Sequence, residues 1–311
     1  MLKGLLFVSA VTIGLAAPAL ILPGTRFDGF PRPVQAVGAA PWTTGIGPSS
    51  LPAGTQVAAG GTIDVNCDGI DDILLQNAAG WIGTFIMDGS GHPAEFRYIY
   101  PGPVTVRVVG TGDLNSDGIS DILVLDHLNW IGGILMSCTG LPVNFFYVKP
   151  GSSSRVAGML DLNTDGIADI LLQSDAQLLI GLTLDGQGVP MNLFFVYPAS
   201  TGGWLARATG DLNGDGIADI VVQRPDTYWV AALFMNGTGS PTSFDYVYVG
   251  SMFDWEVAGA ADLNEDGIVD IIFQNGADWV GGFLMNGHGQ AFDFIYVYPG
   301  STDGWHVVGG R

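Results

Sequence analysis

Five stretches of ten residues concentrate the acidic side chains of this sequence. In DLNGDGIADI, residues 211–220, Asp stands at the first, fifth and ninth positions, Asn at the third and Gly at the sixth. A curling loop turns every second side chain toward one centre, and calcium is bound by about six to eight oxygen ligands. The spacing therefore predicts a calcium site, completed by the backbone carbonyl at the seventh position.

The acidic loop occurs four more times, as DVNCDGIDDI (64–73), DLNSDGISDI (113–122), DLNTDGIADI (161–170) and DLNEDGIVDI (262–271). We therefore expect about five calcium ions (Ca2+) in one chain. The predicted ligands occupy the first, third, fifth, seventh and ninth positions of each copy: Asp64, Asn66, Asp68, Ile70, Asp72, Asp113, Asn115, Asp117, Ile119, Asp121, Asp161, Asn163, Asp165, Ile167, Asp169, Asp211, Asn213, Asp215, Ile217, Asp219, Asp262, Asn264, Asp266, Ile268 and Asp270.

The alternative is a set of turns in which each Asp or Asn side chain caps its own backbone. Such turns do not explain why three carboxylates stand together in each loop, where unneutralised charges repel. Magnesium requires a stricter octahedron, and zinc prefers His or Cys ligands, which are not found at ligand spacing. An EF-hand is excluded because its twelfth position carries Glu, whereas that position is apolar in all five copies here.

The residues around each loop indicate β-strands. In the last copy, apolar and alternating runs cover 255–263, 270–275, 279–289 and 292–300. The pair Asn286-Gly287 favours a type I′ hairpin between the last two runs, because that turn requires two positive φ angles. Each repeat therefore predicts a four-stranded antiparallel meander with the acidic loop between its first and second strands.

A repeat of about 49 residues that contains four strands is typical of a β-propeller blade. We predict an all-β propeller of about five blades over residues 56–311, with a β-solenoid as the alternative. One first-strand segment is left over, because six occur, at 56–62, 106–112, 154–160, 204–210, 255–261 and 305–310. The surplus strand has three expected roles: closure of the ring, pairing with a second copy, or the start of a blade completed elsewhere.

The segments GDLNSDGISDILV (112–124) and GDLNGDGIADIVV (210–222) resemble the FG-GAP or VCBS repeats of integrin-α-type propellers and bacterial surface proteins. The resemblance covers roughly residues 56–311. It implies a calcium-bound β-propeller outside the cytoplasm, with the loop residues above as ligands. Five blades are fewer than the seven usual in integrin-type propellers, so the partner-binding faces of that family are not carried over.

The N-terminus indicates export. Residues 1–19 combine Lys3, an apolar run and small residues, which is typical of a secretory signal peptide, with an uncleaved membrane anchor as the alternative. Residues 20–55 are rich in Pro and Gly and indicate a linker or irregular lead-in. We expect an extracytoplasmic protein that is secreted, periplasmic or at the cell surface. Cys67 and Cys138 are then either a disulfide or two free thiols.

Composition excludes several classes of protein. The net charge is −20 over 311 residues, with only 10 Lys and Arg, so a nucleic-acid partner is not expected. Hydrophobic residues make up 48%, which is enough for a large core rather than a disordered acidic tail. Membrane contact is expected only through the N-terminal segment if it is not cleaved.

Other candidate residues are weaker. Four tryptophans (Trp81, Trp130, Trp229 and Trp279) open the third strand of four repeats and suggest either sugar stacking or packing. Four tyrosines end the fourth strands, either at the rim or on a binding surface: Tyr100, Tyr197, Tyr248 and Tyr298. The four histidines show no catalytic spacing, and we expect no enzyme.

The favoured function is a binding, adhesion or scaffold module with an unknown protein or glycan partner. The alternatives are a carbohydrate-binding lectin and a subunit of a larger assembly that self-associates through its terminal strand. A propeller-based lyase or hydrolase is less favoured, because it would need an asymmetric polar cluster in the central channel.

Overall fold

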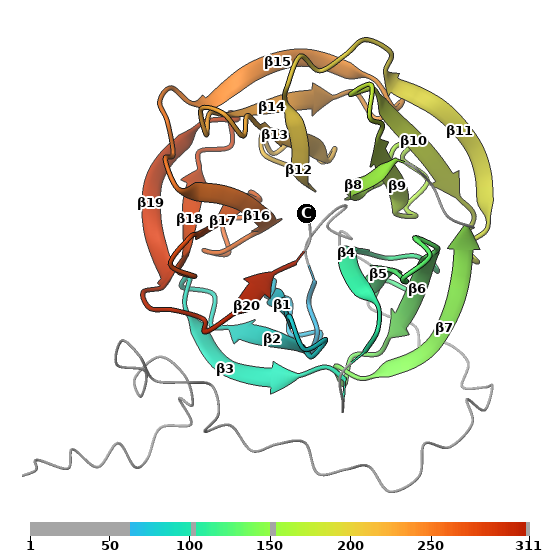
Figure 1. The fold of residues 1–311 in the computed structure, drawn as a ribbon, viewed down its shortest axis with the longest axis horizontal. Coiled ribbons are helices and arrows are strands. Elements are labelled where there is room, and N and C mark those ends of the chain that lie inside the picture. The colour runs from blue at the N-terminus through green and yellow to red at the C-terminus, as the bar shows by residue number, and fades with distance from the viewer. Residues whose placement is uncertain (1–62, 101–103, 150–153, 309–311) are drawn as a thin grey trace, which may run out of the picture.

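The computed structural model describes residues 63–100, 104–149 and 154–308, which form five four-stranded antiparallel sheets. The sheets stand radially around one axis as the blades of a propeller (Figure 1). The predicted five-bladed all-β propeller is confirmed. The β-solenoid alternative is wrong, because the last strand returns to the first sheet and closes a ring.

Each blade takes four strands from one repeat, except at the closure. Blade one is β20-β1-β2-β3, and blades two to five are β4–β7, β8–β11, β12–β15 and β16–β19. The strands are β1 (Ile73–Asn77), β2 (Ile82–Met87), β3 (Pro93–Tyr98), β4 (Arg107–Gly112), β5 (Asp121–Leu125), β6 (Ile131–Met136), β7 (Pro142–Lys149), β8 (Arg155–Leu160), β9 (Asp169–Gln173), β10 (Leu179–Leu184), β11 (Pro190–Tyr197), β12 (Leu205–Gly210), β13 (Asp219–Gln223), β14 (Val230–Met235), β15 (Pro241–Tyr248), β16 (Trp255–Ala261), β17 (Asp270–Asn275), β18 (Val280–Met285), β19 (Ala291–Tyr298) and β20 (Trp305–Val307).

The surplus strand closes the ring. β20 pairs antiparallel with β1, with Val307 opposite Leu75 and Trp305 opposite Asn77. The C-terminal strand thus supplies the innermost strand of blade one, and the expected segment at 56–62 lies outside the described residues. Because β20 pairs inside its own chain, the structure does not support self-association through this strand.

The core lies between the blades. The second and third strands of each blade are buried on both faces, as in DIVVQ of β13 and VAALFM of β14, and therefore read as continuous apolar runs. One cluster joins Ile73 and Leu75 of blade one to Ile272 of blade five and Val307 of the closing strand. Each such fully buried side chain contributes about 1.5–3 kcal/mol.

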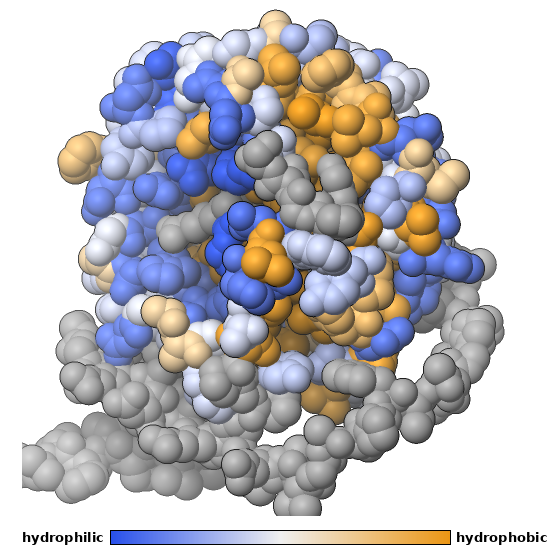
Figure 2. Space-filling model, turned by 45° about the vertical axis from the view of Figure 1, so that its right-hand side comes forward, coloured by the Kyte–Doolittle hydropathy of each residue, from blue (hydrophilic) through white to orange (hydrophobic). Residues whose placement is uncertain are grey.

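The outermost strands have one apolar face toward solvent. On β11, Met191, Leu193 and Phe195 are each about 60% exposed, at 63%, 60% and 58%. Figure 2 shows apolar residues gathered over one part of the molecular surface. Charged residues make up only 13% of the sequence, and apolar side chains cover part of the outer surface.

The hairpins between third and fourth strands differ from the predicted type. In the last repeat only Gly287 of the Asn-Gly pair has positive φ, at 68°. The turn spans Asn286 to Gln290, because the Asn286 N–H donates to the Gln290 carbonyl at 3.0 Å. Within it, the Asn286 side chain accepts the His288 N–H at 2.8 Å. The type I′ prediction is therefore wrong, because the Asn side chain stabilises a longer turn.

Buried glutamines join neighbouring blades. At the end of β13, Gln223 Nε2 donates to the Trp255 carbonyl and Gln223 Oε1 accepts the Val257 N–H, both at 2.9 Å. The same pair of bonds is made across the following blade boundary by Gln76, Gln173 and Gln274. In blade two the position is Leu125. Sequence reasoning missed these residues, although a polar residue ending four apolar runs at the same position is a usable signal.

The two cysteines form a disulfide between blades one and two. Cys67 lies in the acidic loop before β1 and Cys138 in the hairpin after β6, with 5.1 Å between their Cα atoms and 2.00 Å between the sulfurs. The alternative of free thiols is therefore wrong. A disulfide is typical of proteins outside the cytoplasm.

Candidate calcium loops and an inter-blade cavity

Each acidic loop connects the innermost strand of a blade to the second strand. In blade four, the loop begins with Asp211 where β12 ends and finishes with Asp219, the first residue of β13. Gly216 at its sixth position has φ +82°, a conformation that glycine adopts without strain. The chain thus reverses within a few residues, between the end of β12 and the start of β13.

The first and fifth side chains organise the loop. Asp211 Oδ2 accepts the Gly216 N–H at 2.7 Å, and Asp211 Oδ1 accepts the Gly214 N–H at 2.7 Å. Asp215 Oδ1 accepts the Ile217 N–H at 2.9 Å, while Asn213 Oδ1 accepts the Asp215 N–H at 2.9 Å. The turn is therefore held by its own acidic side chains, as the self-capping alternative describes.

The ninth aspartate belongs to the core. Asp219 is 0% exposed, and its two oxygens accept the N–H groups of Leu212 at 3.2 Å and Met235 at 2.9 Å. It thus joins the start of the loop to the end of β14. The equivalent Asp72, Asp121, Asp169 and Asp270 bind the corresponding two N–H groups in their own blades.

Burial raises the pKa values of these aspartates. Desolvation is the largest cause, and it is partly offset by the backbone N–H donors. The pKa rises to about 7 for Asp72, Asp169, Asp219 and Asp270, and to about 8 for Asp121. The first and fifth carboxylates of each loop raise it further by charge repulsion. A nearby cation would lower all of these pKa values.

The donor types fit calcium, whereas the described conformation does not gather the carboxylates. Within the described residues, no group of three or more His, Cys, Asp or Glu side chains is placed to hold a metal ion. A carboxylate has about four lone-pair sites, so two backbone bonds leave each ninth aspartate able to accept a further ligand bond. The ligand assignment stays a prediction for all five loops.

The tryptophans at the start of the third strands pack within their own blades. The rings of Trp81, Trp130, Trp229 and Trp279 make edge contacts with tyrosine on the fourth strand, at centroid distances of 5.4, 5.4, 5.2 and 5.8 Å. The tyrosines are Tyr98, Tyr147, Tyr246 and Tyr296. These contacts favour the packing interpretation of the tryptophans over sugar stacking.

Polar side chains near the axis are asymmetric but bridge the blades. Arg155, at the start of β8, donates to Gln173 Oε1 at 2.9 Å and to the Ala206 carbonyl of the next blade. Burial, with Arg207 and Arg107 nearby, lowers the pKa of Arg155 to about 10. Arg207 lies 3.8 Å from Glu256 of blade five. These contacts hold innermost strands together and provide no positive sign of catalysis.

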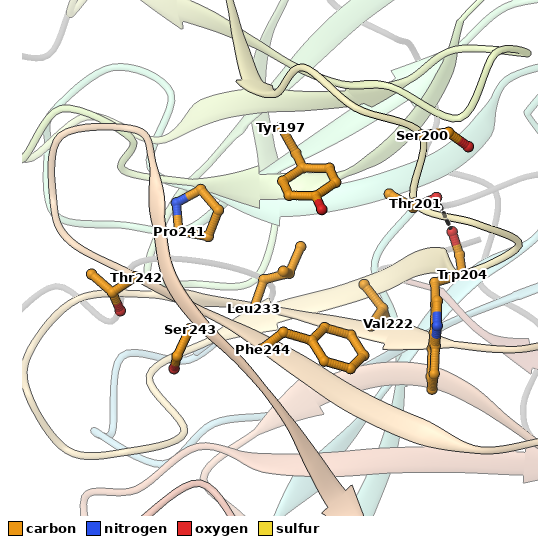
Figure 3. Close-up of a pocket in the computed structure, with 10 residues that line it drawn as sticks. All are labelled: Tyr197, Ser200, Thr201, Trp204, Val222, Leu233, Pro241, Thr242, Ser243 and Phe244. Atoms are coloured by element: carbon orange, nitrogen blue, oxygen red, sulfur yellow. Dashed lines mark hydrogen bonds between the residues drawn. The ribbon is translucent and has the colours of Figure 1, made fainter.

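A cavity of about 420 Å3 lies where blade three meets blade four. Figure 3 shows Tyr197 and Phe244 on opposite sides of it, with Trp204 and Pro241 toward its two ends. The Thr201 hydroxyl donates to the Trp204 carbonyl at 2.6 Å, and the guanidinium of Arg224 lies 5.9 Å from the Trp204 ring. Of the four strand-ending tyrosines, Tyr197 is thus part of a cavity wall, whereas Tyr298 is 2% exposed and packs in the core.

The geometry defines a five-bladed β-propeller, and an acidic loop of the same residue pattern occurs in each of its five repeats. Residues 161–222 and 211–273 each match the model of the FG-GAP-like repeat. The expected resemblance to FG-GAP repeats is thereby confirmed over residues 161–273 of the propeller. No curated protein matches the sequence.

Two solved structures show a distant likeness to this chain. A lectin of Agrocybe aegerita, described for specific recognition of non-reducing terminal N-acetylglucosamine, is 19% identical, with a TM-score of 0.46 over 82% of this chain and 71% of the lectin. A protein of unknown function from Bacteroides caccae is 11% identical, with a TM-score of 0.38 over 72% of this chain and 73% of that protein.

The expected signal or anchor at 1–19 and the lead-in at 20–55 lie outside the described residues. Within the described part of the chain, no helix is long and apolar enough to cross a membrane.

Proposed function

We propose that this protein is an exported, calcium-binding β-propeller that acts as a binding, adhesion or scaffold module. The observation that carries the proposal is the acidic loop repeated in all five blades. Each loop places three carboxylates at its first, fifth and ninth positions, where unneutralised charges repel. A hard divalent cation would neutralise these carboxylates.

The loop residues would hold calcium with oxygen donors only. The first, fifth and ninth aspartates, the third asparagine and the seventh backbone carbonyl are the expected donors. Calcium would then stabilise the fold, because an ion that binds only the native state adds RT ln(1 + [Ca2+]/Kd) per site, about 2.7 kcal/mol at a concentration of 100 Kd. The disulfide between Cys67 and Cys138 supports an oxidising compartment outside the cytoplasm.

Native mass spectrometry and calorimetry of the chelator-treated protein test the proposal. We expect about five bound Ca2+ ions after titration, a higher melting temperature, and little effect of Mg2+. Asp215→Ala should lower the count by one, whereas Asp245→Ala, on the outer strand β15, should leave it unchanged. A protein that binds no ion and melts at the same temperature with and without calcium would show that the loops are self-capped turns.

Carbohydrate binding is the second candidate function. The four tryptophans at the start of the third strands do not favour carbohydrate binding, because their side chains pack against tyrosines of their own blades. The observation that favours it is the cavity between blades three and four, where aromatic rings and hydroxyl groups line one space.

A further inference from the structure

Two residues that line the cavity between blades three and four are aliphatic, whereas the next blade boundary carries phenylalanine at both equivalent positions. Leu233 of β14 and Val222 of β13 form its floor. At the next boundary, between blades four and five, the equivalent residues are Phe283 and Phe273, whose ring centroids lie 4.9 Å apart. Phe283 also reaches Tyr248, the equivalent of Tyr197, at 5.3 Å.

The closure between blades five and one is filled in a similar way. Phe85, at the position of Leu233, stacks on Tyr298 with 5.2 Å between the ring centroids. Phe96, at the position of Phe244, is only 5% exposed, whereas Phe244 is 42% exposed. The same aromatic wall is therefore covered at the closure and open between blades three and four.

The walls of the open cavity are aromatic and carry hydroxyl groups. Trp204 packs its ring against Phe244, with 5.3 Å between the centroids. The hydroxyl of Tyr197 points into the space in Figure 3, and no hydrogen bond engages it within the described residues. The Thr201 hydroxyl donates to a carbonyl and accepts from Gln173 Nε2 at 3.1 Å, which leaves one lone pair for a ligand hydroxyl.

We propose that this cavity binds one neutral sugar residue, with the C–H face of the ring on Phe244 and Trp204 and a sugar hydroxyl at Tyr197. The proposal rests on the proposed function of the chain as a binding module and names the ligand class of one site. A volume of about 420 Å3 lies at the small end of the roughly 300–1,000 Å3 range of ligand sites, which favours a single ring over a chain of sugars.

Charge selects a neutral sugar. The cavity wall contains no charged side chain. Arg224, whose guanidinium lies 5.9 Å from the centre of the Trp204 ring, is paired with Asp226 at 3.0 Å and does not offer an uncompensated charge to a ligand. The net charge of −20 further disfavours uronic or sialic acids.

Ligand-observed NMR with the full, calcium-loaded protein tests the inference. The probes are the methyl pyranosides of glucose, galactose and mannose, with glucuronate as the charged probe and phenol as the aromatic probe. We expect saturation transfer to at least one neutral pyranoside. Leu233→Phe should weaken this binding more than tenfold without lowering the melting temperature, because the chain already carries Phe at the equivalent positions 85 and 283.

A second pair of variants isolates the hydroxyl. Tyr197→Phe should weaken pyranoside binding about three- to tenfold, the effect of one hydrogen bond. The matched control is Tyr248→Phe, which removes the equivalent hydroxyl outside the cavity and should leave binding unchanged. Because both variants keep the aromatic ring, the comparison does not depend on a variant that disturbs the fold.

Three results would overturn the inference: no pyranoside binding, pyranoside binding that survives Leu233→Phe, or binding of phenol alone. None of these results bears on calcium, which is measured separately by ion counting and melting. Conversely, a protein that binds sugar but no calcium would refute the calcium proposal and leave the cavity assignment standing.

Discussion

Replacement of Gln223 should destabilise the propeller at a single blade boundary. Its side-chain amide makes two hydrogen bonds to β16 of the next blade, to Trp255 and Val257, and both Gln223 and Val257 are at most 1% exposed. In Gln223→Leu the side chain still fills the space, but a backbone N–H and a carbonyl lose their partners. Each loss costs about 1–3 kcal/mol, so we expect a decrease of about 2–6 kcal/mol in the free energy of unfolding.

Urea unfolding at a fixed calcium concentration, followed by tryptophan fluorescence, measures this change. Typical domains are stable by about 5–15 kcal/mol, so the expected loss is readily detected. Gln187→Leu, at an exposed hairpin position, should change the free energy by less than about 0.5 kcal/mol. If Gln223→Leu is as stable as the native chain to within about 0.5 kcal/mol, the two hydrogen bonds do not hold the blades together. A leucine at this position, as at Leu125 in blade two, would then be sufficient at every blade boundary.

Three further predictions follow from the loops and the disulfide. Reduction of the bond between Cys67 and Cys138, which are 71 residues apart, should lower the free energy of unfolding by about 4 kcal/mol, measured by urea unfolding with and without reductant. Thr164 holds a β-branched side chain at φ 59° where blade four has Gly214, so Thr164→Gly should stabilise the protein by about 1 kcal/mol, whereas Gly214→Thr should do the opposite in the same melting assay. Burial raises the pKa of Asp219 from its ordinary 3.8 to about 7, so the folded state binds the proton more tightly than the unfolded state. Without calcium, the melting temperature should therefore rise as the pH falls from about 7 to about 4, and saturating calcium should abolish that rise. A chelated protein that loses stability over the same pH range would contradict the pKa assignment.

The sequence predicted the parts of this fold that depend on local pattern. Strand runs, the acidic loops and the number of blades follow from a repeat that reads the same way five times. The sequence shows the closing strand as a surplus first-strand segment, but it does not show with which strand that segment pairs. The pairing of β20 with β1 joins residues more than 200 positions apart, and no local signal encodes it. The disulfide stayed open for the same reason: its two loops meet only once neighbouring blades are set side by side.

The cavity was the least predictable feature, because it shows only when this boundary is compared with the two boundaries where Phe85 and Phe283 fill the equivalent space. Tyr197 was recognised as a repeated strand end, yet nothing in its own repeat distinguishes it from Tyr298. Only the packing shows that Phe85 covers Tyr298 while Leu233 leaves Tyr197 open.

The ninth aspartate of each loop links the proposed calcium binding to the packing of its blade. Asp219 is at once the last predicted calcium ligand and a fully buried side chain that holds the start of its loop to the end of β14. A buried negative charge in this position costs free energy without a cation, and a protonated carboxyl is a poor calcium ligand. Protonation of Asp219 should therefore change both the affinity for calcium and the stability of the blade. If calcium occupies the loops, each ion therefore stabilises its blade from within, and loss of calcium should loosen the hairpin after β14 before the outer strands separate. Hydrogen exchange of the Met235 N–H, with and without chelator, reports this order directly.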